Sequence, residues 1–346
     1  MPPTFIHPAL DLNGRVELRH GSGGRAMAQL IEQLFWRTLD NELLRQGNDQ
    51  ALFQPPPGRL VISTDAHVVT PLLFPGGDIG HLSVHGTIND VAMSGARPLY
   101  LAAAFILEEG LPLSDLAHIV ASMAQAANAA GVPVITGDTK VVERGKADGC
   151  FITTTGIGVV PEGVMISGER ATAGDAILVS GTLGDHGIAV MAAREQLGLE
   201  MELISDSAAL HELVAAMVAA VPQMHCLRDP TRGGMAATLN ELAQQSQVGM
   251  QIKESAIPVR EPVRGVCELL GLDPLHVANE GKLIAICPAD HAQRLLATMR
   301  AHPLGQDAAI IGEVVEDRHC FVQLHTQLGG WRVVDWLGGE QLPRIC

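Results

Sequence analysis

The sequence lacks several features that mark common classes of protein. Its six cysteines include no C-x-x-C pair, which argues against a zinc site or a disulfide framework and predicts reduced thiols in a cytoplasmic protein. No run approaches the ~20 apolar residues that cross a bilayer, and no basic start precedes an apolar segment, so we expect no signal peptide. The phosphate-binding loop G-x-x-x-x-G-K-S/T is also absent.

Basic residues are too few to favour nucleic acid as a partner. The chain has 23 Lys and Arg against 38 Asp and Glu, a net charge of −15, which repels phosphate backbones and anionic membrane surfaces. We therefore expect no nucleic acid and no membrane partner. A phosphate-bearing ligand would need a bridging cation or local basic residues.

The length and the pattern of segments predict two domains of α/β or α+β class. At 346 residues the chain exceeds the size at which a single core keeps growing. Strands are expected at 59–65, 132–139 and 151–160, and a helix with Ser114 as its N-cap should end at Gly131.

A second strand-and-helix unit begins after a loop-like segment near residues 160–170. Its first strand is expected within 172–187, running into a glycine-rich turn, its later strands around 282–287 and 308–315, and its helices lie between them. The predicted division is residues 1–165, residues 166–337 and a tail, residues 338–346, that carries the terminal cysteine.

Five aspartates lie at or near the ends of strand-like segments: Asp65, Asp78, Asp90, Asp138 and Asp229. Aspartate is common in turns, so each has an ordinary explanation. Three of them are flanked by glycine and short hydroxyl residues, which favours a functional explanation over the ordinary one. Carboxylates repel phosphate directly, but Mg²⁺ between them completes its octahedral shell from both, so the set also fits a magnesium–nucleotide site.

Lys140, Glu280 and Cys346 each allow two interpretations. Lys140 is either a surface ion-pair residue or a cation that faces a phosphoryl group, and Glu280 is either a turn carboxylate or a base. The segment HGSGG, with Gly21, Gly23 and Gly24, is a weak glycine-rich loop. The last residue, Cys346, is either an accidental exposed thiol or the reactive end of the molecule.

Taken together, these segments resemble a known family, HypE, the carbamoyl-dehydrating hydrogenase maturation factors. This family lies within the superfamily of aminoimidazole ribonucleotide synthetase and selenophosphate synthetase. The resemblance covers nearly the whole chain. It rests on HGSGG, STD, GGDIG, GTINDVAMSGA, FILEEGLP, TGDTKVV, SGTLGDHG, LRDPTRGG, RGVCELLGLDPL, NEGKL and the terminal PRIC, in that order.

The resemblance implies two domains of the aminoimidazole ribonucleotide synthetase type, with the amino-terminal domain forming a homodimer through joined strands and a flexible carboxyl-terminal tail. It implies the cofactors ATP and Mg²⁺, bound without a phosphate-binding loop. The implied catalytic residues are Cys346, Lys140 and Glu280. The implied metal ligands are Asp65, Asp78 and Asp90, and the implied nucleotide-side residues are Gly21, Gly23, Gly24, Asn89, Asp138, Thr139 and Asp229.

The implied reaction converts a carbamoyl group on Cys346 into thiocyanate at the expense of ATP. A HypF-type carbamoyltransferase would load the cysteine, and a HypC–HypD complex would accept the cyanide for the iron of a nickel–iron hydrogenase. Two alternatives remain. A small-molecule synthetase of the same superfamily is disfavoured, because the glycine-rich segment has no cysteine and such an enzyme has no use for a terminal one. A non-catalytic thiol carrier is disfavoured by the aspartates and Lys140.

Overall fold

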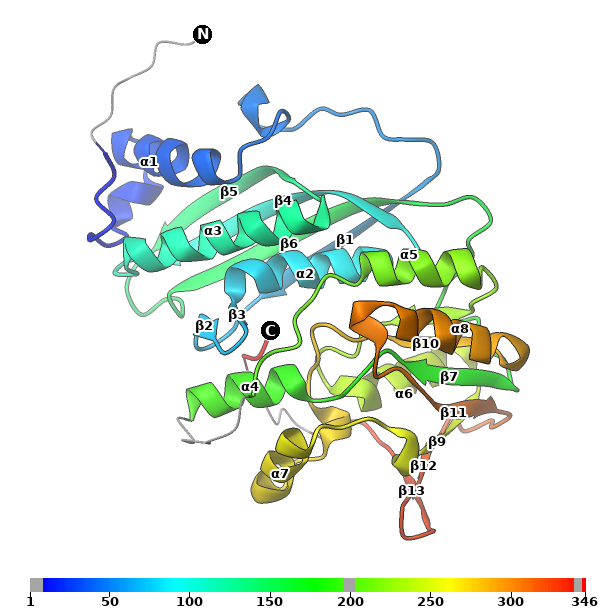
Figure 1. The fold of residues 1–346 in the computed structure, drawn as a ribbon. Helices are drawn as coiled ribbons and strands as arrows, with labels where there is room; N and C mark the ends of the chain where they lie inside the picture. Colours follow the sequence, from blue (N-terminus) through cyan, green and yellow to red (C-terminus); the bar gives the residue numbers. More distant parts are fainter. Residues whose placement is uncertain (1–8, 196–202, 339–343) are drawn as a thin grey trace.

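The structure, a computed structural model, describes residues 9–195, 203–338 and 344–346. Two sheets organise it (Figure 1), the first with four strands and the second with seven. The first runs in the order β1 (Arg59–His67), β6 (Cys150–Val160), β4 (Arg97–Glu108), β5 (Val134–Val142). The second runs in the order β13 (Trp331–Val333), β12 (Val322–His325), β9 (Gly249–Lys253), β11 (Ala309–Val315), β7 (Asp175–Val179), β10 (Ile284–Pro288), β8 (Cys226–Arg228).

The predicted boundary at residue 165 falls between the last strand of the first sheet and the first strand of the second. A two-stranded ribbon, β2 (Leu73–Phe74) with β3 (Gly77–Asp78), follows β1. The short 3-10 helices are η1 (Leu18–Gly21), η3 (Leu44–Gln46), η4 (Glu254–Ala256), η5 (Pro274–His276) and η6 (Pro303–Gly305). No helix within the described ranges is long and apolar enough to cross a membrane.

Helices cover one face of the four-stranded sheet and leave the other open. α2 (Ile79–Ala92) packs on β1 and β6, and α3 (Leu113–Ala130) packs beside α2. Near β5 the cover continues with α1 (Arg25–Leu30) and η2 (Ile31–Trp36), where the ring centroids of Phe35 and Phe105 lie 4.9 Å apart. On the open face, Leu60 and Ile62 are 60% and 69% exposed. This apolar face and the edge strand β1 are therefore free to contact another surface.

The start of α3 differs from the prediction. Pro112, and not Ser114, occupies the N-cap position, and no side chain caps the helix. The fixed φ of proline suits a helix start, so the chain turns into the helix one residue before the serine. The predicted end is confirmed, because Gly131 takes the left-handed conformation with φ 66° that closes many helices.

The seven-stranded sheet is covered on both faces. All five residues of β7 are buried, and alternate ones belong to different cores. Ile177 packs in the core that includes α6 (Gly234–Ser246), whereas Leu178 packs in the core that includes α5 (His211–Ala220) and α8 (Ala289–Ala301). Two more helices, α4 (Asp185–Arg194) and α7 (Glu261–Leu270), form a smaller cluster beside them.

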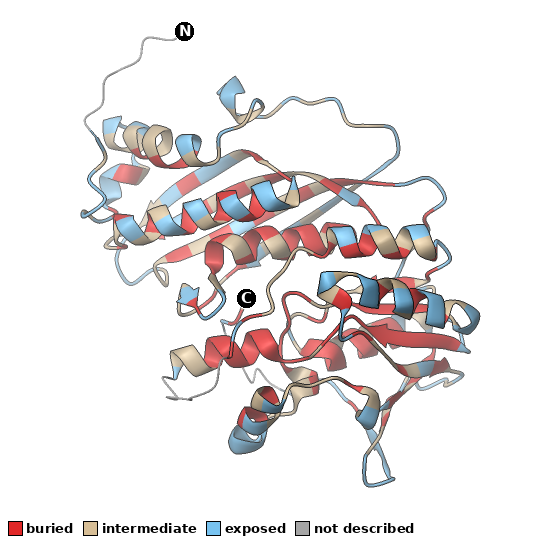
Figure 2. Ribbon diagram, viewed as in Figure 1, coloured by how far each residue is buried: buried red, intermediate tan, exposed pale blue. Residues whose placement is uncertain are grey.

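Helix α2 lies between the two domains and is buried almost all round (Figure 2). Leu82 and Ile88 belong to the core of the first domain, whereas Ala92 packs in the core formed with α5 and α8. A helix that is buried on nearly every side has little solvent face to present. Residues on α2 are therefore fixed relative to both domains at once.

The carboxyl-terminal residues dock at this domain boundary, close to α4 (Figure 1). The backbone N–H of Val68 donates to the carbonyl oxygen of Cys346 over 3.2 Å, and that of Thr70 donates to the carbonyl of Arg344 over 3.2 Å. Ile345 is 3% exposed and belongs to the core of the first domain. The predicted tail spans residues 338–346, of which 339–343 lie outside the described residues.

A glycine pair tests the close approach of β4 and β5. A Cβ on Gly137 would lie 2.1 Å from the carbonyl oxygen of Ala103, whereas a Cβ on Gly265, within α7, would meet nothing within 4 Å. We expect Gly137→Ala to lower the free energy of unfolding by roughly 1–3 kcal/mol. Gly265→Ala should raise it by about 0.5–1 kcal/mol, since alanine favours the helix. Urea unfolding of both variants measures this, and equal effects would contradict the packing described.

Candidate functional site

The site begins with two carboxylates that α2 and β1 bring face to face. Ser63 and Asp65 share one face of β1, because side chains two residues apart on a strand point the same way. The Ser63 hydroxyl donates to Asp90 Oδ2, on α2, over 2.8 Å. Partial burial raises the pKa of Asp90, and the negative charge of Asp65 raises it further, while the Ser63 hydrogen bond opposes both. The two aspartates are thus close enough to repel each other.

The second domain adds two more acidic groups from neighbouring loops. Asp229 follows β8 and Glu280 precedes β10, and Asn279 ties the two loops together by donating through its side chain to the Pro230 carbonyl over 3.0 Å. Burial and the charge of Asp90 raise the pKa of Asp229 to about 7. Glu280, only 3% exposed, has its pKa raised well above the ordinary value by burial and by the charges of Asp229, Asp206 and Asp65.

The backbone around Glu280 is held in place from three sides. Its N–H donates to Asp206 Oδ1 over 3.0 Å, and its carbonyl accepts from Asn89 Nδ2 over 3.2 Å. A Cβ on Gly281 would lie 1.8 Å from the Asp206 carbonyl oxygen, so the next position admits only glycine. One oxygen of the Glu280 side chain, Oε1, is buried without a hydrogen-bond partner. Glu280 is therefore rigidly placed with unused acceptor capacity.

Cys346 completes this group. A side-chain hydrogen bond joins its thiol to Glu280, and burial together with the Glu280 charge raises the pKa of the thiol. His186 contacts the Ile345 carbonyl through Nε2 at 2.8 Å, and Arg344 pairs with Asp148 at 2.8 Å. We call Asp65, Asp90, Asp229, Glu280 and Cys346 the acidic cluster.

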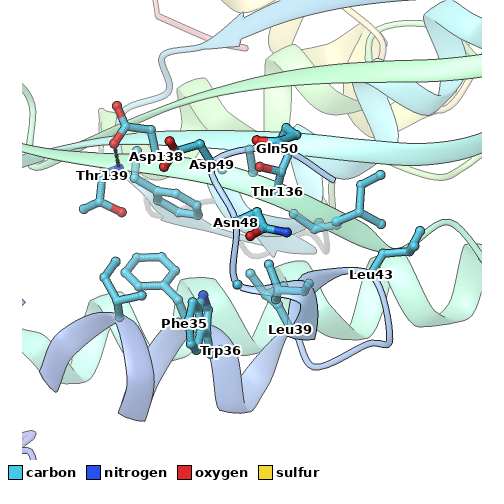
Figure 3. Close-up of a pocket in the computed structure, with 18 of the residues that line it drawn as sticks. Phe35, Trp36, Leu39, Leu43, Asn48, Asp49, Gln50, Thr136, Asp138 and Thr139 are labelled. Atoms are coloured by element: carbon cyan, nitrogen blue, oxygen red, sulfur yellow. Dashed lines mark hydrogen bonds between the residues drawn. The ribbon is translucent and has the colours of Figure 1, made fainter. Parts of the chain in front are cut away.

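Other predicted residues gather elsewhere, at β5 (Figure 3). Lys140 Nζ contacts both oxygens of Asp138, at 2.7 and 3.0 Å, in an exposed ion pair. The Thr139 N–H donates to Asp138 Oδ1 over 2.8 Å. Asp138 and Thr139 line a cavity of about 430 Å³ that Phe35 and Trp36 line from the helix on its other side. The glycine-rich loop is adjacent, since a Cβ on Gly21 would lie 2.9 Å from the Val141 nitrogen. Gly23 and Gly24 follow, both exposed.

The register of the sheet separates Lys140 from the acidic cluster. Asp65 pairs through Thr154 and Ala103 with Gly137, so Asp138 and Lys140 point to the opposite, open face. Three strand spacings of ~4.8 Å place β5 about 14 Å from β1. Lys140 and Glu280 of one chain therefore do not meet in this structure.

Two predicted residues have structural roles here. The Asp78 carboxylate accepts from the N–H groups of Gly80 (2.7 Å) and His81 (3.3 Å), so it caps α2 and is not part of the acidic cluster. Asn89 donates to the Ala208 and Glu280 carbonyls and accepts from the Leu210 N–H, so its amide is engaged by protein backbone.

Sequence reasoning missed Arg232, which lines a cavity together with Cys346, Asp206, which accepts from the Glu280 N–H, and Ser63, which donates to Asp90. Arg232 and Ser63 lie inside the segments LRDPTRGG and STD, so a basic or hydroxyl residue beside a motif aspartate was the available signal. The sequence gives no such signal for Asp206, because Asp206 and Glu280 are far apart in the chain and only folding brings them into contact.

Comparison with known proteins identifies the family. Residues 47–160 match the AIR synthase related protein, N-terminal domain, and residues 172–325 match its C-terminal domain. The carbamoyl dehydratase HypE of Azotobacter vinelandii is 70% identical over 338 residues, 97% of this chain and 99% of that protein. The chain belongs to the HypE family. Its fold is accordingly the two-domain fold of that family.

Solved HypE structures match the chain over nearly its full length. A crystal structure of HypE in complex with ATP has a TM-score of 0.92 and 52% identity, covering 95% of this chain and 99% of that one. A HypE–HypF complex matches with a TM-score of 0.79 and 48% identity, covering 89% and 99%. The HypE fold of this chain therefore brings Glu280 and Cys346 together with three aspartates.

The raised pKa of Asp229 predicts a pH-dependent stability. Because the folded pKa lies above the unfolded value, protonation stabilises the fold, and this contribution is lost as pH rises from about 4 through about 7. Asp229→Asn should therefore raise the melting temperature more at pH 8 than at pH 5, with at most about 4 kcal/mol involved.

The matched control is Asp307→Asn, at an exposed position of the same domain. Thermal unfolding in metal-free buffer measures both variants. A stabilisation by Asp229→Asn that is equal at both pH values would contradict the mutual repulsion described.

Proposed function

We propose that this chain dehydrates an S-carbamoyl group on its own Cys346 to thiocyanate, with ATP, to supply cyanide for the iron of a nickel–iron hydrogenase. The observation that carries the proposal is the docking of Cys346 against Glu280 within the acidic cluster. Relatives named carbamoyl dehydratase support it, as does the relative solved with ATP.

The chemistry proceeds in two balanced steps. The carbamoyl oxygen attacks the γ-phosphorus, the bond to ADP breaks, and one nitrogen proton is lost. The C–O bond then breaks, phosphate leaves, and loss of the second nitrogen proton gives the nitrile. Phosphorylation turns a poor leaving group into a good one, so the task of the protein is mainly positioning and charge stabilisation.

Glu280 is the proposed base for the nitrogen proton. A carboxylate whose pKa is raised, as burial and nearby negative charges raise that of Glu280, is a stronger proton acceptor than an ordinary one. Asn89, Asp206 and Gly281 fix its backbone, and the unpartnered Oε1 gives it a free lone pair. Burial of this position excludes water, which would otherwise hydrolyse the intermediate.

The acidic cluster fits a divalent cation. The charge of Asp65 raises the pKa of Asp90, and the charges of Asp90 and Asp65 raise that of Asp229, and a divalent cation would relieve this repulsion. Within the described ranges no three His, Cys, Asp or Glu residues already form a metal-holding group. Mg²⁺ needs no closed protein cage, because phosphate and water complete its shell. These three aspartates would hold it, and it would neutralise phosphate charge; Asp78 takes no part.

The nucleotide-side residues Gly21, Gly23, Gly24, Asp138 and Thr139 share one end of β5, and we propose that they approach the ATP of a second copy. A homodimer through joined strands, with β5 of one protomer beside β1 of the other, would bring Lys140 and Asp138 of one protomer toward the acidic cluster of the other. The exposed Leu60 and Ile62 support such an interface.

A HypF-type carbamoyltransferase is the proposed donor of the carbamoyl group, supported by the HypE–HypF complex. A HypC–HypD complex is the proposed acceptor of the cyanide, and we place both partners in the cytoplasm.

Intact mass tests the function directly. Protein loaded by its carbamoyltransferase should lose one water from the Cys346 adduct on addition of ATP and magnesium. Cys346→Ala should abolish product while ATP binding persists, and Lys140→Ala should accept the carbamoyl group but not dehydrate it. An adduct that survives ATP unchanged would leave only a thiol carrier, and no adduct at all would favour a small-molecule synthetase.

Mixed protomers test the contribution of the second copy. Lys140→Ala and Glu280→Gln should each dehydrate poorly, because one lacks the cation and the other the base. After mixing and exchange of protomers, activity should return to roughly a quarter of wild type, since half the dimers are mixed and each has one complete site. Native mass spectrometry of the mixture, with one variant isotope-labelled so that the mixed dimer is resolved, is the control for exchange. No recovery in the first mixture would place both residues in one protomer.

A further inference from the structure

Arg232 borders the cavity that contains Cys346. This cavity, of about 300 Å³, is lined by residues of both domains and of the tail, among them Ala66, Val68, Arg232, His276 and Cys346. Arg232 lies in the turn between β8 and α6, and it is an exposed residue. A phosphoryl group on the Cys346 adduct would have to occupy space next to this thiol.

The Arg232 guanidinium forms no hydrogen bond and no ion pair with any residue that the structure describes. Neighbouring cations are engaged: Arg228 pairs with Glu241, and Arg344 pairs with Asp148. Lys140 pairs with Asp138 on the other face of the sheet. Among these four cations, Arg232 is the one whose guanidinium N–H groups remain available to bind a ligand.

Its positive charge nevertheless acts on the cluster. It lowers the pKa of Cys346 and of Asp90, against the larger effect of burial on each, and it lowers that of His67. An arginine beside carboxylates would ordinarily pair with one of them. Here the carboxylates are held by Ser63, by the backbone or by the thiol, and Arg232 lines the cavity beside them.

The turn that carries Arg232 is fixed by its neighbours. Gly233 and Gly234 have φ of 76° and 61°, and a Cβ on Gly234 would lie 2.5 Å from the Leu275 carbonyl oxygen. Residues other than glycine rarely adopt this conformation. The Cα of Arg232 is therefore held against the loop that leads to Glu280, while its side chain can rotate.

We propose that Arg232 is a catalytic residue that binds the phosphoryl group during its transfer from ATP to the carbamoyl oxygen on Cys346, and holds it until phosphate departs. The inference rests on the proposed dehydration. The forming O–P bond and the breaking P–O bond of ATP spread charge over the phosphoryl oxygens, and a guanidinium donates to two of them at once. When the C–O bond breaks, the same donors stabilise the leaving phosphate.

The test uses full-length protein that has been carbamoylated on Cys346 and freed of its carbamoyltransferase. Single-turnover dehydration is followed by intact mass at several ATP concentrations with magnesium. Arg232→Ala should slow the maximal rate by about 10²–10³-fold. Arg232→Lys keeps the charge but loses the planar pair of donors, so it should still lose about tenfold or more. Carbamoylation should be unchanged in both.

Rescue distinguishes catalysis from a structural role. Low concentrations of guanidinium ion, well below those that unfold the protein, should restore part of the rate of Arg232→Ala. They should not affect wild type or Arg318→Ala, an exposed arginine of the same domain. Full activity of Arg232→Ala, or a loss that only tracks the melting temperature and is not rescued, would overturn the inference.

A labelled substrate separates failure of this inference from failure of the proposed function. With heavy oxygen in the carbamoyl group, wild-type protein should release labelled phosphate together with thiocyanate. If the label does not reach phosphate, the dehydration by phosphorylation itself is wrong. If it does, while Arg232→Ala behaves as wild type, only the role of Arg232 is wrong.

Discussion

The repulsion among carboxylates at the domain boundary is the constraint on which the rest of the structure depends. Asp65 and Asp90 come from the first domain, and Asp229 and Glu280 from the second, and the charges of the three aspartates raise the pKa of neighbouring carboxyl groups in this set. Such an arrangement is unfavourable for folding unless packing elsewhere enforces it. The enforcement comes from α2, buried against both domains, and from the hydrogen bonds that fix the loops around Asn279 and Glu280.

That constraint also explains the division of labour among the polar residues. Asp78 and Asn89 lie on the same helix as Asp90, yet their side chains serve the backbone: one begins the helix, and the other joins it to the loop that carries Glu280. Glu280 in the acidic cluster keeps an oxygen with no hydrogen-bond partner, whereas the side chains of Asp78 and Asn89 are engaged by the protein backbone. Preorganisation of this kind removes the cost of rearranging the site when a charged substrate arrives.

Much of the fold was predictable from the sequence, because strands such as 59–65 and the helix that ends at Gly131 have local signals. The composition of the cluster was predictable only in part. Asp65, Asp90, Asp229, Glu280 and Cys346 do come together, but from spacing alone Asp78 and Asn89 look the same as Asp90, since a helix cap and a ligand are both polar residues beside a turn. The separation of Lys140 from Glu280 follows from strand register, and the engagement of Asp206 from tertiary contact, and neither leaves a local pattern.

The contacts that hold the docked tail mostly do not involve the terminal sulfur. Val68, Thr70 and His186 contact the carbonyl oxygens of residues 344–346, Ile345 packs in the core, and Arg344 pairs with Asp148, and these groups are identical whatever the sulfur carries. Bare and modified forms of the chain therefore have nearly the same tendency to dock, apart from what the adduct itself contacts. The fraction of chains whose tail is docked therefore does not depend on how far the reaction on Cys346 has gone. An irreversible step is then needed to give turnover a direction, and cleavage of a phosphoanhydride is such a step.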